Sequence, residues 1–69
     1  MTSHGKVVSF DPEIGLGEVA PAAGGAVLMF HCTQIADGSR TIEPGVSVEY
    51  QVLPGRLGRW EAAALRMVG

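Results

Sequence analysis

The residue types that carry most enzyme chemistry are sparse in this sequence. Cys32 is the only cysteine, and His4 and His31 have no second cysteine or histidine at a metal-binding spacing. Ser9, His31 and Asp37 are the types found in a catalytic triad, but nothing in so small a chain indicates the geometry that a triad needs. We therefore expect the chain not to be an enzyme and to carry no metal and no cofactor.

Aromatic rings beside basic side chains are the usual chemistry of single-strand nucleic-acid contact. Trp60, the only tryptophan, directly follows Arg59 and stands near Arg56 in the sequence. These three residues, with Lys6, are candidates for stacking and for phosphate contact. The alternatives are that Trp60 is a hydrophobic plug over one end of the fold or an anchor for a partner protein, and that the basic residues are solvated surface charges.

The charge balance argues against tight, generic nucleic-acid binding. Five basic and seven acidic residues give a net charge of -2, whereas such binding draws on phosphate neutralisation by Lys and Arg. The basic residues lie mostly from residue 40 onward, so a local basic strip is compatible with the acidic total. The N-terminus lacks the apolar core of a signal peptide, and the longest apolar stretch, 26–30, is too short to span a membrane. We expect no membrane association and, with a lone thiol, a cytoplasmic location.

Short strands must position these candidates, because ten glycines and four prolines interrupt the chain. A short helical turn is predicted at 32–35. In the region after residue 45, Val46, Val48, Tyr50 and Val52 alternate with polar residues and predict an apolar strand face. The residues near the C-terminus have good helix propensity, but we predict a strand there because the sheet needs a closing strand. We predict strands over residues 5–10, 15–19, 26–31, 46–52 and 60–68.

Five strands of this length leave too little chain for two packed sheets. Closing them into a barrel removes the exposed edges that would invite aggregation. A chain of 69 residues is enough for one domain. We therefore predict an all-β, five-stranded antiparallel barrel that occupies residues 1–69 as a single domain.

An ordered series of short segments resembles the bacterial cold-shock domain over residues 4–68. The matches are GKVVSFD at 5–11, GLGEV at 15–19, LMFH at 28–31, IADG at 35–38, IEPG at 42–45, VEY at 48–50 and the alanine pair at 62–63. The resemblance implies an OB-type barrel that binds single-stranded RNA or DNA, with aromatic side chains on the second and third strands stacking on bases. A nucleic-acid chaperone or a regulator of expression is the corresponding role.

Most of the implied stacking groups are replaced in this chain. The family's first-strand Lys-Trp-Phe-Asn corresponds to Val-Ser-Phe-Asp here, so only Phe10 keeps its ring. The family's second strand reads Lys-Gly-Phe-Gly-Phe, and Leu16 and Glu18 stand at its two aromatic positions. In the third strand the histidine is kept as His31, while Met29 replaces a phenylalanine. Several lost rings, at roughly 1–3 kcal/mol each, predict weakened or altered binding.

Strand alternation predicts that Met29 and His31 face outward and that Phe30 faces the core. For the three residues kept on the platform other interpretations stay open: Phe10 as a half-buried core aromatic, His31 as a surface histidine at a strand end, and Met29 as an exposed filler. The candidate nucleic-acid-binding set is Lys6, Phe10, Leu16, Met29, His31, Arg56, Arg59 and Trp60.

The sequence therefore indicates two candidate functions. One is a cold-shock-like protein that binds single-stranded nucleic acid with weakened or altered affinity. The other is a barrel that has lost this binding and associates with a protein partner or as a homodimer, for which the acidic balance and the apolar Leu16 and Met29 are the grounds.

Overall fold

The computed structural model describes residues 2–38, 40–55 and 59–68. Every predicted strand and the predicted helical turn are present, with ends displaced by one or two residues. Along the chain the elements are β1 (Ser3–Asp11), β2 (Leu16–Pro21), β3 (Leu28–His31), the 3-10 turn η1 (Cys32–Gln34), β4 (Ser47–Pro54) and β5 (Trp60–Met67).

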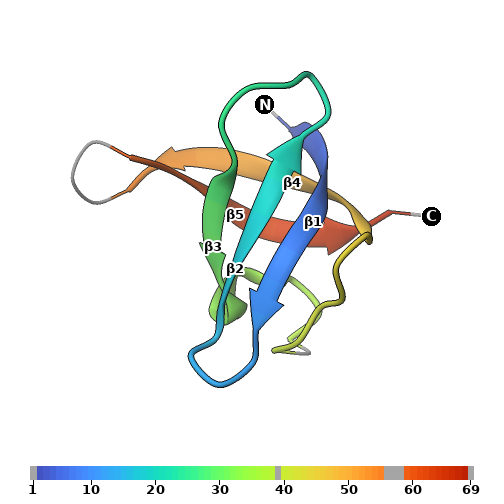
Figure 1. Cartoon of the computed structure of the whole chain (residues 1–69), viewed down its shortest axis with the longest axis vertical. Helices are drawn as coiled ribbons and strands as arrows, with labels where there is room; N and C mark the ends of the chain where they lie inside the picture. The colour runs from blue at the N-terminus through green and yellow to red at the C-terminus, as the bar shows by residue number, and fades with distance from the viewer. Residues whose placement is uncertain (1, 39, 56–58, 69) are drawn as a thin grey trace.

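The strands form a closed barrel in the order β1-β2-β3-β5-β4. Strands β1, β2 and β3 lie side by side, β4 and β5 cross behind them, and the ends of β4 and β5 near residues 54 and 60 extend beyond the barrel (Figure 1). The ring is completed because β4 also pairs with β1, and β5 with β3. The prediction of an all-β, closed, five-stranded barrel is confirmed.

The barrel is antiparallel, as predicted, at every strand pair but one. Strands β3 and β5 run parallel, with Met29 opposite Glu61, and an isolated parallel bridge joins Ile35 to Leu65. Parallel neighbours require a crossover connection rather than a hairpin. Here the crossover runs through η1 and β4, which returns β5 to the direction of β3. The other four strand pairs are antiparallel.

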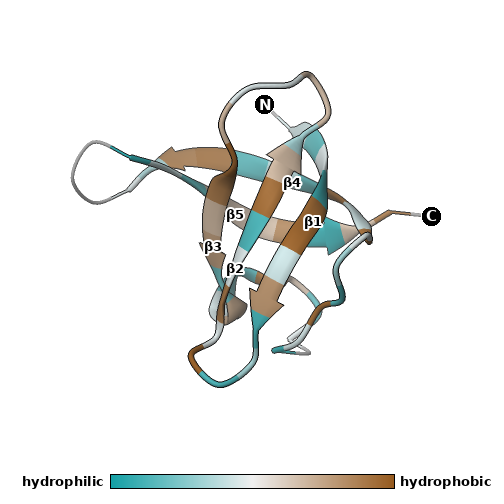
Figure 2. Ribbon diagram, viewed as in Figure 1, coloured by the Kyte–Doolittle hydropathy of each residue, from teal (hydrophilic) through white to brown (hydrophobic). Residues whose placement is uncertain are grey.

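The core fills the barrel with side chains from every strand, and hydrophobic and hydrophilic residues alternate along the strands (Figure 2). Val48 and Tyr50 on the predicted apolar face of β4 are buried, whereas Val52 on the same face is 39% exposed. The last residue of β4 with a partner on β1 is Tyr50, opposite Ser3, so β1 does not cover Val52. The main buried cluster is Val7, Val19, Phe30, Ile35, Ile42, Val48, Tyr50, Ala62 and Leu65.

A bulge in β1 sets which residues of that strand face outward. Val7 is opposite Val19, but Ser9 is already opposite Glu18, so Val8 is the extra residue and lies exposed. A bulge of this kind reverses the alternation beyond it. Phe10 consequently lies opposite the buried Gly17 and packs toward the core.

Strand β5 replaces the helix that its local composition favours. Residues 60–63 and 66–67 form a ladder with β4, and Ala62, Ala63 and Leu65 are buried. Ala64 lies between them with a φ of 52° and donates its backbone N–H to Gln34 Oε1 at 3.2 Å. This left-handed residue accompanies the shift of register between β4 and β5, which lets the strand bury Ala62 and Leu65, three residues apart, together.

Candidate functional site

A row of outward-facing side chains crosses the barrel from β1 to β5. Ser9 is opposite Glu18, Glu18 is opposite Met29, and Met29 is opposite Glu61. Directly opposed residues on neighbouring strands project from the same face. Ser9 Oγ donates a hydrogen bond to Glu18 Oε1 at 3.0 Å. The row therefore carries two carboxylates and one thioether, on the side where the family resemblance implies aromatic rings.

A second row lies one step along the strands. Asp11 is opposite Leu16, and Leu16 is opposite His31. Because residues two apart in a strand share a face, Leu16 and Glu18 project from β2 together, as Met29 and His31 do from β3. The structure thus brings four predicted binding residues onto one surface, which we call the outer face: Leu16, Met29, His31 and the edge of Phe10, with Ser9 and Glu18.

The outer face is hollowed between β1 and β2. The hollow has a volume of about 280 Å³ and we call it the outer hollow. Four apolar side chains line it, and its charged lining among the described residues consists of two carboxylates. A flat, uncharged group can therefore be held there by apolar contact, whereas an anion meets repulsion. The lining residues are Ser9, Phe10, Asp11, Ile14, Leu16, Gly17, Glu18 and Met29.

Phe10 is both a core residue and part of the hollow. Its ring stacks on the buried Phe30 with centroids 6.0 Å apart and planes inclined by 12°. Gly17 makes this possible, because a Cβ there would lie 2.5 Å from Phe30 Cζ and 2.7 Å from the Ser9 carbonyl oxygen. The stacking of Phe10 on Phe30 beneath the outer face therefore requires a glycine at position 17. Half-buried Phe10 offers an edge to the hollow, held rigid from below.

His31 is exposed and caps η1. Its Nδ1 accepts a hydrogen bond from the Thr33 N–H at 3.2 Å and lies 2.9 Å from Thr33 Oγ1. With Nδ1 accepting, the proton of the neutral ring belongs on Nε2. The strand-end interpretation and the binding interpretation are therefore compatible, because one nitrogen holds the turn and the other is a donor beside Leu16.

The predicted basic residues do not gather at the outer hollow. Lys6 is exposed on β1, opposite Ala20, and does not line the hollow. Arg66 Nη1 contacts Glu49 Oε1 at 3.3 Å on the β4–β5 side. Arg59 is exposed beside Trp60, and Arg56 falls outside the described residues. Over the part of the chain that the structure describes, the hollow has no cation in its lining.

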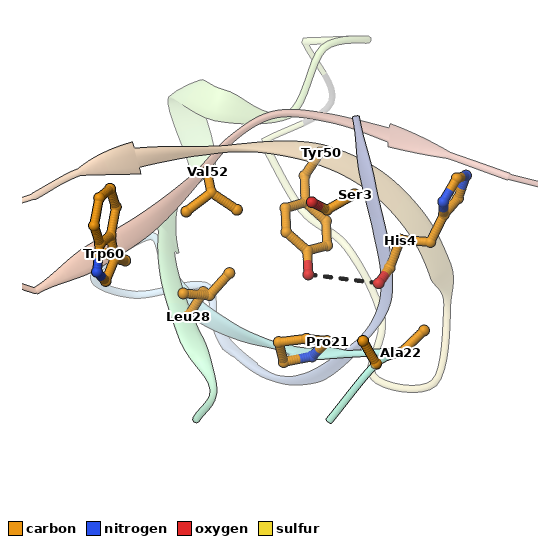
Figure 3. Close-up of a pocket in the computed structure, with 9 residues that line it drawn as sticks. Ser3, His4, Pro21, Ala22, Leu28, Tyr50, Val52 and Trp60 are labelled. Atoms are coloured by element: carbon orange, nitrogen blue, oxygen red, sulfur yellow. Dashed lines mark hydrogen bonds between the residues drawn. The ribbon is translucent and has the colours of Figure 1, made fainter. Parts of the chain in front are cut away.

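Trp60 faces away from Met29. Glu61 shares the outer face with Met29, so its neighbour Trp60 projects from the opposite face of β5. Its indole is 58% exposed and lies at the mouth of the barrel with Leu28 and Val52 (Figure 3). The sequence analysis offered a position over one end of the fold as an alternative for Trp60, but it did not predict the groove around this residue. The signal for it was Val52, which continues the apolar alternation of β4 after the neighbouring strand has ended.

The described residues show neither a membrane-spanning helix nor a metal centre. No helix among them is long and apolar enough to cross a membrane. In the same ranges no group of three or more His, Cys, Asp or Glu side chains is arranged to hold an ion. Cys32 is a free, half-buried thiol packed against the core.

Comparison with known proteins adds one informative likeness. No protein-family model and no curated protein sequence matches the chain. Among solved structures, the chain is similar to a cold-shock domain in the Drosophila Unr structure CSD456, with a TM-score of 0.84 and 26% sequence identity over 100% of this chain. The chain spans 27% of the length of that Drosophila chain. The neighbour supports an OB-type barrel of the cold-shock kind.

Proposed function

We propose that this chain is an OB-type module that binds single-stranded RNA or DNA on the outer face, with lower affinity than a fully aromatic face would give. One observation carries the proposal. Leu16, Met29 and His31 emerge together from β2 and β3, at positions where the cold-shock resemblance implies base contacts. The likeness to a cold-shock domain of Drosophila Unr supports an OB-type nucleic-acid-binding module.

Each side chain has a definite role in this proposal. Bases lie flat against Leu16 and Met29, whose contact is apolar and does not depend on base identity. The edge of Phe10 closes one side of the hollow. His31 donates from Nε2 to a base or a phosphate oxygen.

The weakness of the binding follows from charge and from the missing rings. Glu18 lies in the middle of the face, and Asp11 lines the same hollow. Each carboxylate repels a phosphate that approaches it, most strongly at low salt. Stacking of roughly 1–3 kcal/mol per base is lost wherever an aliphatic side chain replaces a ring. We expect dissociation constants on the order of 0.1 mM for a short oligonucleotide at low salt.

Fluorescence anisotropy of labelled oligothymidylate and oligouridylate tests the proposal. The variant Met29→Ala removes the largest apolar contact from the centre of the outer face, and Met67→Ala removes the same side chain from an exposed position at the far end of β5. We expect Met29→Ala to weaken binding about fivefold, from the loss of roughly 1 kcal/mol of apolar contact. Met67→Ala should bind as the unmodified chain does.

Two results would contradict the proposal. One is the absence of an anisotropy change at protein concentrations up to about 1 mM, where even a contact of roughly 4 kcal/mol is detected. The other is an equal effect of the two methionine variants, which would show that the oligonucleotide does not bind on the outer face.

The second candidate function, association with a protein partner or a second copy, has one observation of its own. The charged side chains in the lining of the outer hollow are both acidic, among the residues described, which suits a neutral or basic partner better than a polyanion. Sedimentation of the purified chain discriminates: a monomer at all concentrations that binds oligonucleotides contradicts the homodimer.

A further inference from the structure

A second concave surface lies at the mouth of the barrel, where Trp60 was found. We call it the end groove; its volume is about 510 Å³. Val52 of β4 and Leu28 of β3 face one another across it, with Tyr50 at its floor and Trp60 at one end (Figure 3). Pro21 forms the wall opposite Tyr50. The lining also contains Ser3, His4, Ala22 and Ala23.

The end groove is nearly free of charge. Of its described lining, His4 is the one residue that can become a cation, and its Nε2 lies 3.5 Å from Glu49 Oε2. Figure 3 shows the imidazole directed away from the groove. No lysine or arginine among the described residues lines the surface, so it offers no counter-charge to phosphate. An occupant of this groove is therefore uncharged where it is buried.

One wall of the groove is an open strand edge. Strand β4 pairs with β1 only from Ser47 to Tyr50. Beyond that point Gln51–Pro54 pair with β5 alone, among the residues described. A strand edge of this kind presents unpaired N–H and C=O groups to whatever lies beside it. Natural edges are protected by charged side chains or by proline. Gln51–Pro54 carry no charge, and Pro54 has no N–H, so the N–H groups of this segment belong to Gln51–Leu53.

We propose that the end groove binds an extended, uncharged peptide segment of a partner protein, which adds to the open edge of β4. The segment runs antiparallel to β4, alongside Gln51–Pro54. Its backbone pairs with the N–H and C=O groups of the β4 edge, and alternate side chains enter the groove against Leu28, Val52 and Trp60. This site is separate from the outer face, because Trp60 and Met29 project from opposite sides of the sheet.

The open backbone edge of β4 indicates that the occupant is an extended polypeptide. Only an extended polypeptide repeats donors and acceptors at the spacing of a strand, and the apolar lining selects small aliphatic side chains at every second position. A second copy that pairs through its own β4 edge is the alternative occupant, and the dependence of the amide shifts on protein concentration tests it.

A blocked synthetic peptide tests the proposal on the intact chain. The probe is acetyl-Thr-Val-Thr-Val-Thr-amide, followed by Trp60 emission and by the backbone amide resonances of Gln51, Val52 and Leu53. We expect saturable shifts at these amides at peptide concentrations up to about 5 mM, as for a contact of roughly 3–4 kcal/mol. The same peptide with both valine nitrogens methylated loses its donors on one edge, and we expect it not to bind.

Two lysine variants of β4 provide the matched comparison. Val52→Lys places a charge inside the groove, whereas Leu53→Lys places the same charge on the opposite face of the same strand. Both side chains are partly exposed, at 39% and 47%, so both variants should fold. We expect Val52→Lys to weaken the peptide at least about tenfold, because the buried part of the groove has no partner for an ammonium group. Leu53→Lys should change the affinity less than about twofold.

Each remaining outcome overturns the proposal. Equal binding of the methylated peptide means that the β4 edge is not used. Equal effects of the two lysine variants, or no shifts at the highest peptide concentration, remove the groove as a peptide site. Shifts of the Gln51–Leu53 amides that depend on protein concentration alone identify a second copy as the occupant, and shifts with oligonucleotide identify a base.

Discussion

Ser9 and Glu18 form a hydrogen bond across β1 and β2, from Ser9 Oγ to Glu18 Oε1 at 3.0 Å. The cold-shock resemblance implies an aromatic ring at each of these two positions. The hydrogen bond gives the half-buried hydroxyl and carboxylate a partner in each other, and it holds the carboxylate in the middle of the outer face. The bulge at Val8 makes the contact possible, because it turns Ser9 outward to face Glu18.

Removal of the Glu18 charge should strengthen nucleic-acid binding. Glu18→Gln keeps an oxygen that accepts from Ser9 and eliminates the repulsion of phosphate. We expect the affinity for an oligonucleotide to rise about two- to fivefold at low salt and the gain to shrink as salt screens the charge. The control is Glu43→Gln, which removes one negative charge from an exposed loop position. An identical gain in both variants would show that only net charge matters.

A ring at position 18 should add stacking to the outer face. We expect Glu18→Phe to improve binding by roughly 1–3 kcal/mol for each base that stacks. Glu18→Leu is the matched control, since it removes the same charge and adds apolar area without a ring. Titration of both variants with oligothymidylate separates the contribution of ring stacking from that of charge removal and added apolar area. If Leu and Phe give equal affinities, bases do not lie on this strand.

Gly17 should tolerate no side chain. A Cβ at this position would lie 2.5 Å from Phe30 Cζ and 2.7 Å from the Ser9 carbonyl oxygen. We expect Gly17→Ala to lower the free energy of unfolding by roughly 1–3 kcal/mol, measured by urea denaturation, because the Phe10–Phe30 stack must move. Gly38 has a φ of 75° and open space around it, so Gly38→Asn should cost less than about 1 kcal/mol. Comparable losses would contradict the packing role of Gly17.

Tyr50 should make stability fall at alkaline pH. Burial of the side chain raises the pKa of the phenol above its ordinary value of 10.0. The unfolded chain therefore releases this proton at a lower pH than the folded chain does. Its contribution to stability is complete below pH 10.0 and is lost as the pH rises toward the folded-state pKa.

Comparison of the chain with Tyr50→Phe isolates this effect. The variant lacks the phenol, and at neutral pH its free energy of unfolding should change by less than about 1 kcal/mol, since the bond to the His4 carbonyl is long. That bond measures 3.5 Å. Above pH 10 the variant should lose less stability than the unmodified chain in parallel urea titrations. Parallel losses would show that Tyr50 ionises equally well in both states.

Local pattern predicted much of this fold. The turn signals and the alternation of Val48 and Tyr50 located the strands, because a period of two and the glycine and proline breaks are properties of neighbouring residues. The outward direction of Met29 and the burial of Phe30 followed from the same alternation, and both are confirmed. The short turn at η1 was also predicted from sequence.

The rest depended on residues that are distant in the chain. The parallel seam between β3 and β5 arises from the path of the whole chain, and helix propensity near Ala64 gave way to pairing with β4. Trp60 faces the end groove rather than the outer face because Glu61 pairs with Met29, a register that only the closed barrel fixes.

Sequence alone determined five short strands, few aromatic side chains and a net charge of -2, since composition and spacing are carried by the residues themselves. Only the tertiary structure decided which residues face one another. Closure of the barrel and the bulge at Val8 brought Ser9 to Glu18 and Phe10 to Phe30. The same closure left the edge of β4 open beside Trp60, because β1 begins to pair with β4 only at Tyr50.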